Sequence, residues 1–162
     1  MTAKNSRGFT LLELLVVVAI IGLLASLVSA FVSSARERSR DARRLSDVDA
    51  FKKALEFYVT SNGRYPSSEG GGPPWKNSCE DGPDWIPDIV AAGYIQALPL
   101  DPVNSVNEDI CYFYRSNGSD FKLAAFMERD ENKAQFAEDD NGTEDEYYEV
   151  FTPGGIWNIP GI

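Results

Sequence analysis

The chain opens with a long apolar run that contains a single charge. From Phe9 to Val32 there is no Lys, Arg, Asp, Asn, Gln or Pro, and Glu13 is the only charged side chain. At about 1.5 Å per residue a helix over this range is roughly 36 Å long, which is enough to cross a hydrocarbon core of about 30 Å with some tilt. The pattern therefore predicts a transmembrane helix over residues 9–32. An unpaired carboxylate in such a segment is costly, so Glu13 needs a partner.

The apolar pattern changes after residue 32, but the helix is not expected to end there. Residues 33–61 contain no Pro or Gly. Their apolar side chains recur at spacings of three and four and form one helix face, made of Leu45, Val48, Phe51, Leu55, Tyr58 and Val59. The dense charges of residues 36–44 indicate a solvated stretch. We predict an amphipathic continuation of the helix over residues 33–61, ended by Asn62-Gly63, because glycine favours the left-handed C-cap.

Residues 62–162 are predicted to form one globular head that contains a β-hairpin. Residues 110–115 and 121–127 are rich in strand-forming side chains, and the Asn117-Gly118 pair between them is a strong hairpin signal. A third strand is expected over residues 147–151. The fold class is therefore α+β, with the amphipathic part of the long helix packed on a small antiparallel sheet of about three strands.

The segment between the helix and the hairpin is expected to be mostly irregular. Residues 84–94 indicate a short helix that ends at Gly93. Residues 98–102 carry two prolines, which remove backbone donors and exclude both a helix and a central strand.

The polar octapeptide before the apolar run suggests a processing site. Residues 1–8 carry Lys4 and Arg7 and end in Gly8 directly against the apolar segment. A secretory signal peptide has its small-residue cleavage site after the apolar segment instead. Cleavage after Gly8 would give Phe9 a free ammonium and keep the helix as an anchor. That ammonium could pair with Glu13 of the same chain or of a neighbouring subunit.

These residues carry a resemblance to a known family. The segment Gly8-Phe9-Thr10-Leu11-Leu12-Glu13 and the apolar residues 18–25 resemble the N-terminus of type IV pilins and type II secretion pseudopilins. The resemblance implies a prepilin peptidase that cuts after Gly8 and N-methylates Phe9, and a Glu13 that meets the Phe9 amine of an adjacent subunit. One departure is Ala30, where these pilins commonly carry a Pro that loosens the helix.

Short motifs in the head resemble the same family and favour its G-type major pseudopilins. They occur in the expected order and comprise Asn62-Gly63-Arg64-Tyr65-Pro66, Gly93-Tyr94-Ile95, Leu98-Pro99-Leu100-Asp101-Pro102 and Tyr112-Phe113-Tyr114-Arg115. The resemblance implies a structural subunit of a type IV pilus or of a type II secretion pseudopilus. It also implies the partners of such a subunit, which are further copies in a helical filament, the peptidase, an inner-membrane assembly platform and a cytoplasmic ATPase.

The implied location is the inner membrane as a single-pass precursor with its head outside the cytoplasm, and then a periplasmic or cell-surface filament. Basic residues cluster just after the predicted span, and the positive-inside rule would place them in the cytoplasm. We give more weight to the processing motif because it is more specific than a charge count. The competing interpretations are a membrane-anchored extracytoplasmic enzyme and a minor or DNA-uptake pilin.

Composition narrows these alternatives. The chain has 162 residues, a formal net charge of −10 and no histidine. Without histidine there is no His-based catalytic triad and no His zinc ligand, and no nucleophile motif or Gly-rich phosphate loop is present. The sequence thus predicts a subunit that is not an enzyme. The acidic balance opposes binding to nucleic acid, although the basic residues within 36–44 could neutralise acidic heads of neighbouring subunits; the alternative is a solvated helix face.

The two cysteines, Cys79 and Cys111, are predicted to form one disulfide, because an even count in an exported domain indicates pairing. Two free thiols are the alternative.

An acidic segment before the last strand is the candidate metal site. Residues 138–146 carry six carboxylate side chains, on both sides of Asn141. The resemblance implies calcium in a loop close to this position. The candidate ligands are Asp139, Asp140, Asn141 and Asp145, since calcium takes six to eight oxygen ligands. The segment does not fit an EF-hand, because Ala137 and Tyr148 would occupy the first and twelfth ligand positions. The alternative is a solvated acidic loop, and no other cofactor is expected.

Overall fold

The computed structural model describes residues 9–68, 75–108, 110–129 and 147–154. Its main element is the helix α1, Leu11–Asn62, which has 52 residues. This confirms the predicted long helix to within two residues at each end. Gly63 follows with a φ of 71°, and its N–H donates to the carbonyl of Val59 at 2.8 Å. Glycine therefore ends the helix in the left-handed conformation that the sequence predicted.

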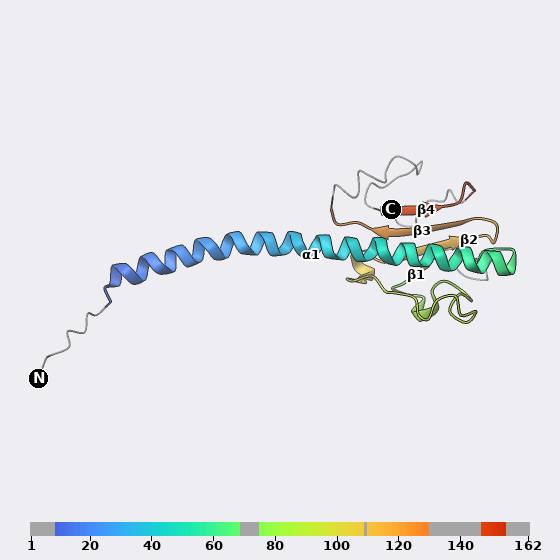
Figure 1. Cartoon of the computed structure of the whole chain (residues 1–162), viewed down its shortest axis with the longest axis horizontal. Helices are drawn as coiled ribbons and strands as arrows, with labels where there is room; N and C mark the ends of the chain where they lie inside the picture. The colour runs from blue at the N-terminus through green and yellow to red at the C-terminus, as the bar shows by residue number, and fades with distance from the viewer. Residues whose placement is uncertain (1–8, 69–74, 109, 130–146, 155–162) are drawn as a thin grey trace, which may run out of the picture. The chain divides into compact units, whose positions relative to one another are not determined.

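The chain divides into two compact units, Met1–Glu37 and Arg38–Ile162, and α1 contributes to both. The first unit contains the apolar part of α1. The second contains the rest of α1, the sheet and the connecting loops (Figure 1).

The second unit contains an antiparallel sheet in the order β1-β2-β3-β4. The strands are β1, Lys76–Asn77; β2, Tyr112–Ser116; β3, Phe121–Phe126; and β4, Tyr147–Phe151. The last three confirm the predicted strands, whereas the two-residue β1 was not predicted because it is too short to leave a pattern. The predicted hairpin joins β2 to β3, with Ser116 opposite Phe121. Gly118 adopts a φ of 93° in its turn.

The core forms where the amphipathic part of α1 packs on this sheet (Figure 1). Val48, Phe51, Leu55 and Tyr58 are buried as predicted. Leu45 and Val59 of the same predicted face are half-buried. The Phe51 ring meets Trp85 edge-to-face, with ring centroids 5.1 Å apart.

Both faces of the sheet carry buried apolar side chains. Tyr112 and Tyr114 belong to the core under α1, whereas Phe113 belongs to a second cluster with Trp75 and Tyr147. This division follows from the alternation of side chains along β2.

The predicted short helix over residues 84–94 is wrong in its extent. The segment forms the 3₁₀ helix η1, Gly82–Asp84, and then a single helical turn; a second 3₁₀ helix, η2, spans Val106–Glu108. Trp85 and Ile86 separate η1 from the turn, and Asp88, near the start of the turn, has a φ of 62°. The predicted end at Gly93 is right. The N–H of Tyr94 donates to Ile89 at 3.2 Å and that of Gly93 to Val90 at 2.9 Å, which is a Schellman motif.

Candidate functional site

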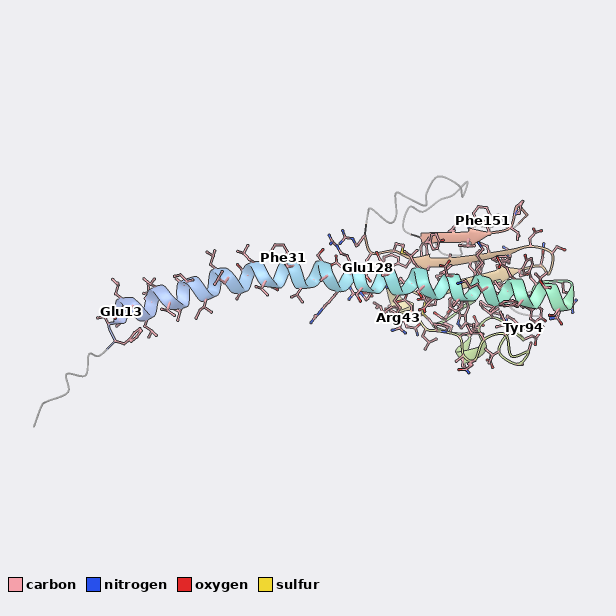
Figure 2. The ribbon with its side chains drawn as sticks, viewed as in Figure 1. Glu13, Phe31, Arg43, Tyr94, Glu128 and Phe151 are labelled. Atoms are coloured by element: carbon pink, nitrogen blue, oxygen red, sulfur yellow. A yellow bond between two sulfur atoms is a disulfide. The ribbon has the colours of Figure 1, made fainter. Side chains whose placement is uncertain are left out.

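The first candidate site is the beginning of α1. Its large apolar side chains, from Leu11 to Val32, are exposed in the single chain, and side chains project outward along this part of the helix in Figure 2. Within the described residues, α1 is the one helix whose length and hydropathy suffice to cross a membrane, and none of its most apolar 18-residue window is buried. A helix with exposed apolar side chains on every side requires lipid or other helices around it.

Glu13 takes part in a capping box at the start of this helix. The hydroxyl and the N–H of Thr10 donate to Oε2 of Glu13 at 2.8 and 2.9 Å, and the N–H of Glu13 donates back to the Thr10 hydroxyl at 3.2 Å. Thr10 is thus the N-cap and Glu13 the N3 residue. The Thr-x-x-Glu spacing ahead of an apolar run is the sequence signal for this capping box, and the interpretation of Glu13 as an unpaired charge did not include it.

The proposed processing site is only partly within the described residues. Gly8 lies outside them, whereas Phe9 is described and highly exposed. Both hydrogen bonds from Thr10 converge on Oε2 of Glu13, so Oε1 retains acceptor capacity for a cation. Cleavage after Gly8 and methylation of Phe9 stay predictions.

The second candidate site is a buried polar cluster around Arg44 in the second unit. Arg44 is fully buried and donates to both oxygens of Asp101, from Nε at 2.6 Å and from Nη2 at 3.0 Å. Its Nη1 donates to Asp41 at 3.0 Å and to Glu128 at 2.6 Å. Arg40 adds a second cation on Glu128, with its Nε 2.7 Å from Oε1. One guanidinium therefore joins α1, the loop after Leu100 and the segment that follows β3.

The carboxylates of this cluster also fix the backbone around it. Asp101 accepts from the N–H groups of Val103 and Asn104 at 2.8 and 3.3 Å. Asp41 accepts from those of Glu128 and Arg129 at 3.0 and 3.2 Å. The cluster therefore sets the path of two connecting segments as well as joining them.

The electrostatics of the cluster favour its charged forms. Burial lowers the pKa of Arg44, but the hydrogen bonds and charges of Asp101 and Glu128 outweigh it, so this pKa lies above its usual value. The hydrogen bond from Arg40 and the contacts with Arg44 hold the pKa of Glu128 below its usual range despite partial burial. At neutral pH Arg44 and Glu128 are therefore both ionised.

Asp47 forms the edge of the cluster. Its Oδ2 accepts from the Tyr112 hydroxyl at 2.8 Å, and Arg43 lies 3.6 Å away on the exposed side. Burial raises the pKa of Asp47, and the hydrogen bond from Tyr112 only partly opposes this. Figure 2 labels Arg43 on α1 and Glu128 beside the same helix.

The prediction that residues 36–44 are solvated is wrong for Arg44 and Asp41, which are buried. The physical reason is that these two positions continue the buried stripe of Val48 and Phe51 backward by steps of four and three. The sequence contained this signal, but charged residues were assumed to lie outside. Arg36 and Arg38 are exposed as expected.

The predicted disulfide is confirmed. Cys79 and Cys111 are bonded, with their Cα atoms 5.8 Å apart and a sequence separation of 32 residues. The bond joins the turn after β1 to the start of β2. It closes a loop that contains η1, the turn ending at Gly93, and Asp101.

The proposed calcium ligands Asp139, Asp140, Asn141 and Asp145 lie outside the described residues. Within the described part of the chain, no group of three or more His, Cys, Asp or Glu side chains is arranged to hold a metal ion. Calcium binding stays a prediction.

Comparisons with known proteins match both parts of the chain. The family described as "Prokaryotic N-terminal methylation motif" matches residues 3–29, and "Type II secretion system (T2SS), protein G" matches residues 32–146. No solved structure matches significantly.

Similar curated proteins include three named type II secretion system core protein G. That of Aeromonas hydrophila is 37% identical over 63% of this chain and 71% of its own length. That of Escherichia coli is 39% identical over 60% and 67%, and that of Klebsiella pneumoniae 37% identical over 63% and 72%. With the protein G family matching well over half of the sequence, and with an N-terminal methylation motif before it, this chain belongs to the type II secretion system protein G family, whose members are structural pseudopilins.

Proposed function

We propose that the chain polymerises through the apolar part of α1 into the pseudopilus filament of a type II secretion system, after cleavage behind Gly8 and methylation of Phe9. The observation that carries this proposal is the helix itself, whose apolar side chains from Leu11 to Val32 have no partner within the described chain. Before assembly a bilayer would cover them. In the filament the same side chains would pack against the helices of neighbouring subunits.

Glu13 would guide each incoming subunit. The capping box occupies Oε2, and the ammonium of Phe9 from a neighbouring subunit would bind the remaining oxygen. In a low-dielectric surrounding an unpaired carboxylate is strongly disfavoured, so a subunit whose Glu13 lacks this cation would be rejected. The pair would thereby set the axial position of one helix against the next.

Three partners follow from this assignment. A prepilin peptidase would remove residues 1–8, an inner-membrane platform would collect the processed subunits, and a cytoplasmic ATPase would drive their extraction from the membrane. The head would lie outside the cytoplasm. The role is structural, and no catalytic step is assigned to the chain.

Two variants of the full-length chain separate the charge of Glu13 from its capping role. Glu13→Gln removes the charge but keeps a side chain that serves equally well in a capping box. Thr10→Ala keeps the charge and removes the cap, at a cost of about 1 kcal/mol in helix stability. We expect Glu13→Gln to insert in the membrane and fail to form filaments, whereas Thr10→Ala still forms them.

Filaments are measured by shearing cells and by electron microscopy, and the mature N-terminus by mass spectrometry of the native chain. Normal polymerisation of Glu13→Gln would contradict the charge-pair mechanism. A native chain that still carries Met1 would contradict the processing step.

We propose separately that the acidic segment before β4 binds calcium, a proposal supported by the charge density of the segment and by the family resemblance. Carboxylates crowded into one loop repel one another, and a divalent cation relieves that repulsion. Isothermal titration of the full chain with calcium should release or absorb heat, and replacing Asp139, Asp140 and Asp145 with Asn should abolish the signal. No heat with the native chain would refute the proposal.

A further inference from the structure

Large apolar side chains that remain exposed in the second unit fall into two places. Among its described residues they are Phe57 on α1, and Leu100, Val103 and Val106 in the loop before β2. Phe57 is 64% exposed. Its neighbours Ala54, Leu55 and Tyr58 are buried in the core, so the exposed ring lies at the edge of the packed face rather than within it. A single projecting aromatic of this kind adds nothing to the core and suits a contact with another molecule.

One of the other exposed apolar residues, Leu100, lines a pocket. It has a volume of about 330 Å³, and its apolar wall is made by Cys79, Pro83, Leu98 and Leu100. This volume is at the lower end of the range for small-ligand pockets, about 300–1,000 Å³, so it suits one ring-sized group.

The wall of this pocket is held in place before anything binds. Cys79 is fixed by the disulfide to Cys111. Ser78 and Asn104, which also line the pocket, are joined by a hydrogen bond of 3.0 Å. A ligand group entering the pocket would therefore not have to order its surroundings, which is the main cost of binding to a flexible surface.

The two places differ in charge. The segment that lines the pocket carries the exposed acids Glu80, Asp81 and Asp84, and only Asp81 is paired with a cation in the described structure, Lys76 at 3.1 Å. On α1, Lys53 is exposed and lies four residues before Phe57, on the same helix face. The aromatic ring is thus accompanied by a cation, and the pocket by an excess of carboxylates.

We propose that Phe57 of one copy of this chain inserts into the pocket beside Cys79 of the next copy, with Lys53 facing the acidic rim at Glu80 and Asp84. This inference rests on the proposed function, because it requires a polymer of this chain. It adds a specific head-to-head contact to assembly through the apolar helix.

The geometry of the contact suits a filament. The projecting side chain and the pocket belong to different surface elements of one subunit, so a copy can receive one neighbour in its pocket while its own Phe57 enters the pocket of another, which makes the contact heterologous. Each subunit offers one of each, and a heterologous contact that does not close into a ring propagates as an open helical polymer. The occupant that fits is therefore a second copy, and a small apolar ligand is the alternative that the test must separate.

A photo-crosslinking experiment tests the contact directly. The photoreactive amino acid p-benzoylphenylalanine is placed at position 57 of the full chain and produced as a minor fraction among native subunits. After irradiation of assembled filaments, we expect covalent dimers whose adduct maps to residues 78–104. The matched control places the same group at Thr60, which is also exposed on α1 and about one turn further along, and should give few such adducts.

Substitutions test the energetics. Phe57→Ala should weaken lateral association. We expect the filament yield, or the detergent concentration that filaments survive, to fall by about tenfold or more, which is the usual effect of truncating an aromatic anchor. Thr60→Ala should leave it unchanged. Lys53→Glu should weaken assembly, and the added change Asp84→Lys should restore it in part. Since Phe57 is exposed, unfolding of the variant in urea should match the native chain.

The outcomes distinguish this inference from the proposed function. Filaments that form normally with Phe57→Ala, or adducts that map to α1 of the neighbour instead of residues 78–104, overturn the inference and leave the filament function standing. Crosslinked products that contain a small molecule and no second copy of the chain also overturn the inference. If the native chain forms no filaments under conditions that assemble the host's secretion system, the proposed function and this inference both fail.

Discussion

Replacing Arg44 should destabilise the second unit far more than replacing its neighbour Arg43. The two arginines are adjacent on α1, but the side chain of Arg44 is fully buried whereas that of Arg43 is 59% exposed. Methionine keeps most of the length of either side chain and removes the charge. The pair Arg44→Met and Arg43→Met therefore compares the same chemical change in two environments.

The expected magnitude follows from what each change leaves behind. Without Arg44, the buried carboxylates of Asp41 and Asp101 lose their cation, and removing one partner of a buried ion pair costs about 3–5 kcal/mol. Both carboxylates keep two backbone N–H donors, which places the expected loss near the lower end, at about 3 kcal/mol. Arg43 makes one exposed contact at 3.6 Å, and its loss should cost less than about 0.5 kcal/mol.

Urea unfolding of the full-length chain in detergent micelles measures the difference. Trp85 is fully buried against Phe51 and reports on the core by its fluorescence. A loss of about 3 kcal/mol is a large share of the 5–15 kcal/mol typical of a domain, so the midpoint should shift clearly. The cost expected for breaking a buried ion pair is well above about 1 kcal/mol. If the free energies of unfolding of Arg44→Met and Arg43→Met differ by less than about 1 kcal/mol, the assignment of Arg44 as the central ion of the cluster is wrong.

Three further outcomes follow from the same structure. Reduction of the Cys79–Cys111 bond, or Cys111→Ser, should lower the free energy of unfolding by about 3–4 kcal/mol through the entropy of a loop of this length, as measured in urea with and without dithiothreitol. The hydrogen bond from Arg40 lowers the pKa of Glu128, so the stability that this carboxylate contributes is complete above its unfolded-state pKa and is lost as the pH falls through the lower folded-state pKa. When the pH falls below about 4.5, the free energy of unfolding of Glu128→Gln should therefore decrease less than that of the native chain. Gly93→Ala should lower the melting temperature by the equivalent of about 1–2 kcal/mol, because Gly93 has a φ of 78° and a Cβ there meets no atom within 4 Å, which leaves backbone strain as the cause.

Elements with local signals could be predicted from the sequence. The extent of α1 was evident because it lacks Pro and Gly and carries an apolar stripe, and the β2–β3 hairpin because Asn117-Gly118 lies between two runs of strand formers. The Cys79–Cys111 disulfide followed from the even count. The helix and the hairpin depend on residues close together in the chain. The disulfide could be predicted because two cysteines allow only one pairing.

Features that depend on distant residues could not be predicted in this way. Nothing local indicates that Asp101 and Glu128 meet Arg44, because they lie 57 and 84 residues away along the chain. The charge of residues 36–44 led to the opposite expectation, since an isolated buried charge is unfavourable. Burial becomes possible only when several carboxylates from separate segments converge on one guanidinium, and that convergence is a property of the tertiary fold.

This cluster also bears on how the head could take part in assembly. The apolar contacts of Phe51 and Leu55 hold α1 on the sheet, but hydrophobic packing is not directional and tolerates small rotations of the helix. The two-pronged contact of Arg44 with Asp101 is directional, because the guanidinium fork and the carboxylate meet only in one plane. We interpret the cluster as fixing the rotation of this part of α1 against the loop that carries Leu100. Because Phe57 lies on that helix and the pocket on that loop, a rotation of α1 would move one binding surface relative to the other. Besides the stability that it contributes, the cluster can therefore be required for a subunit whose neighbours must all be placed by the same geometry.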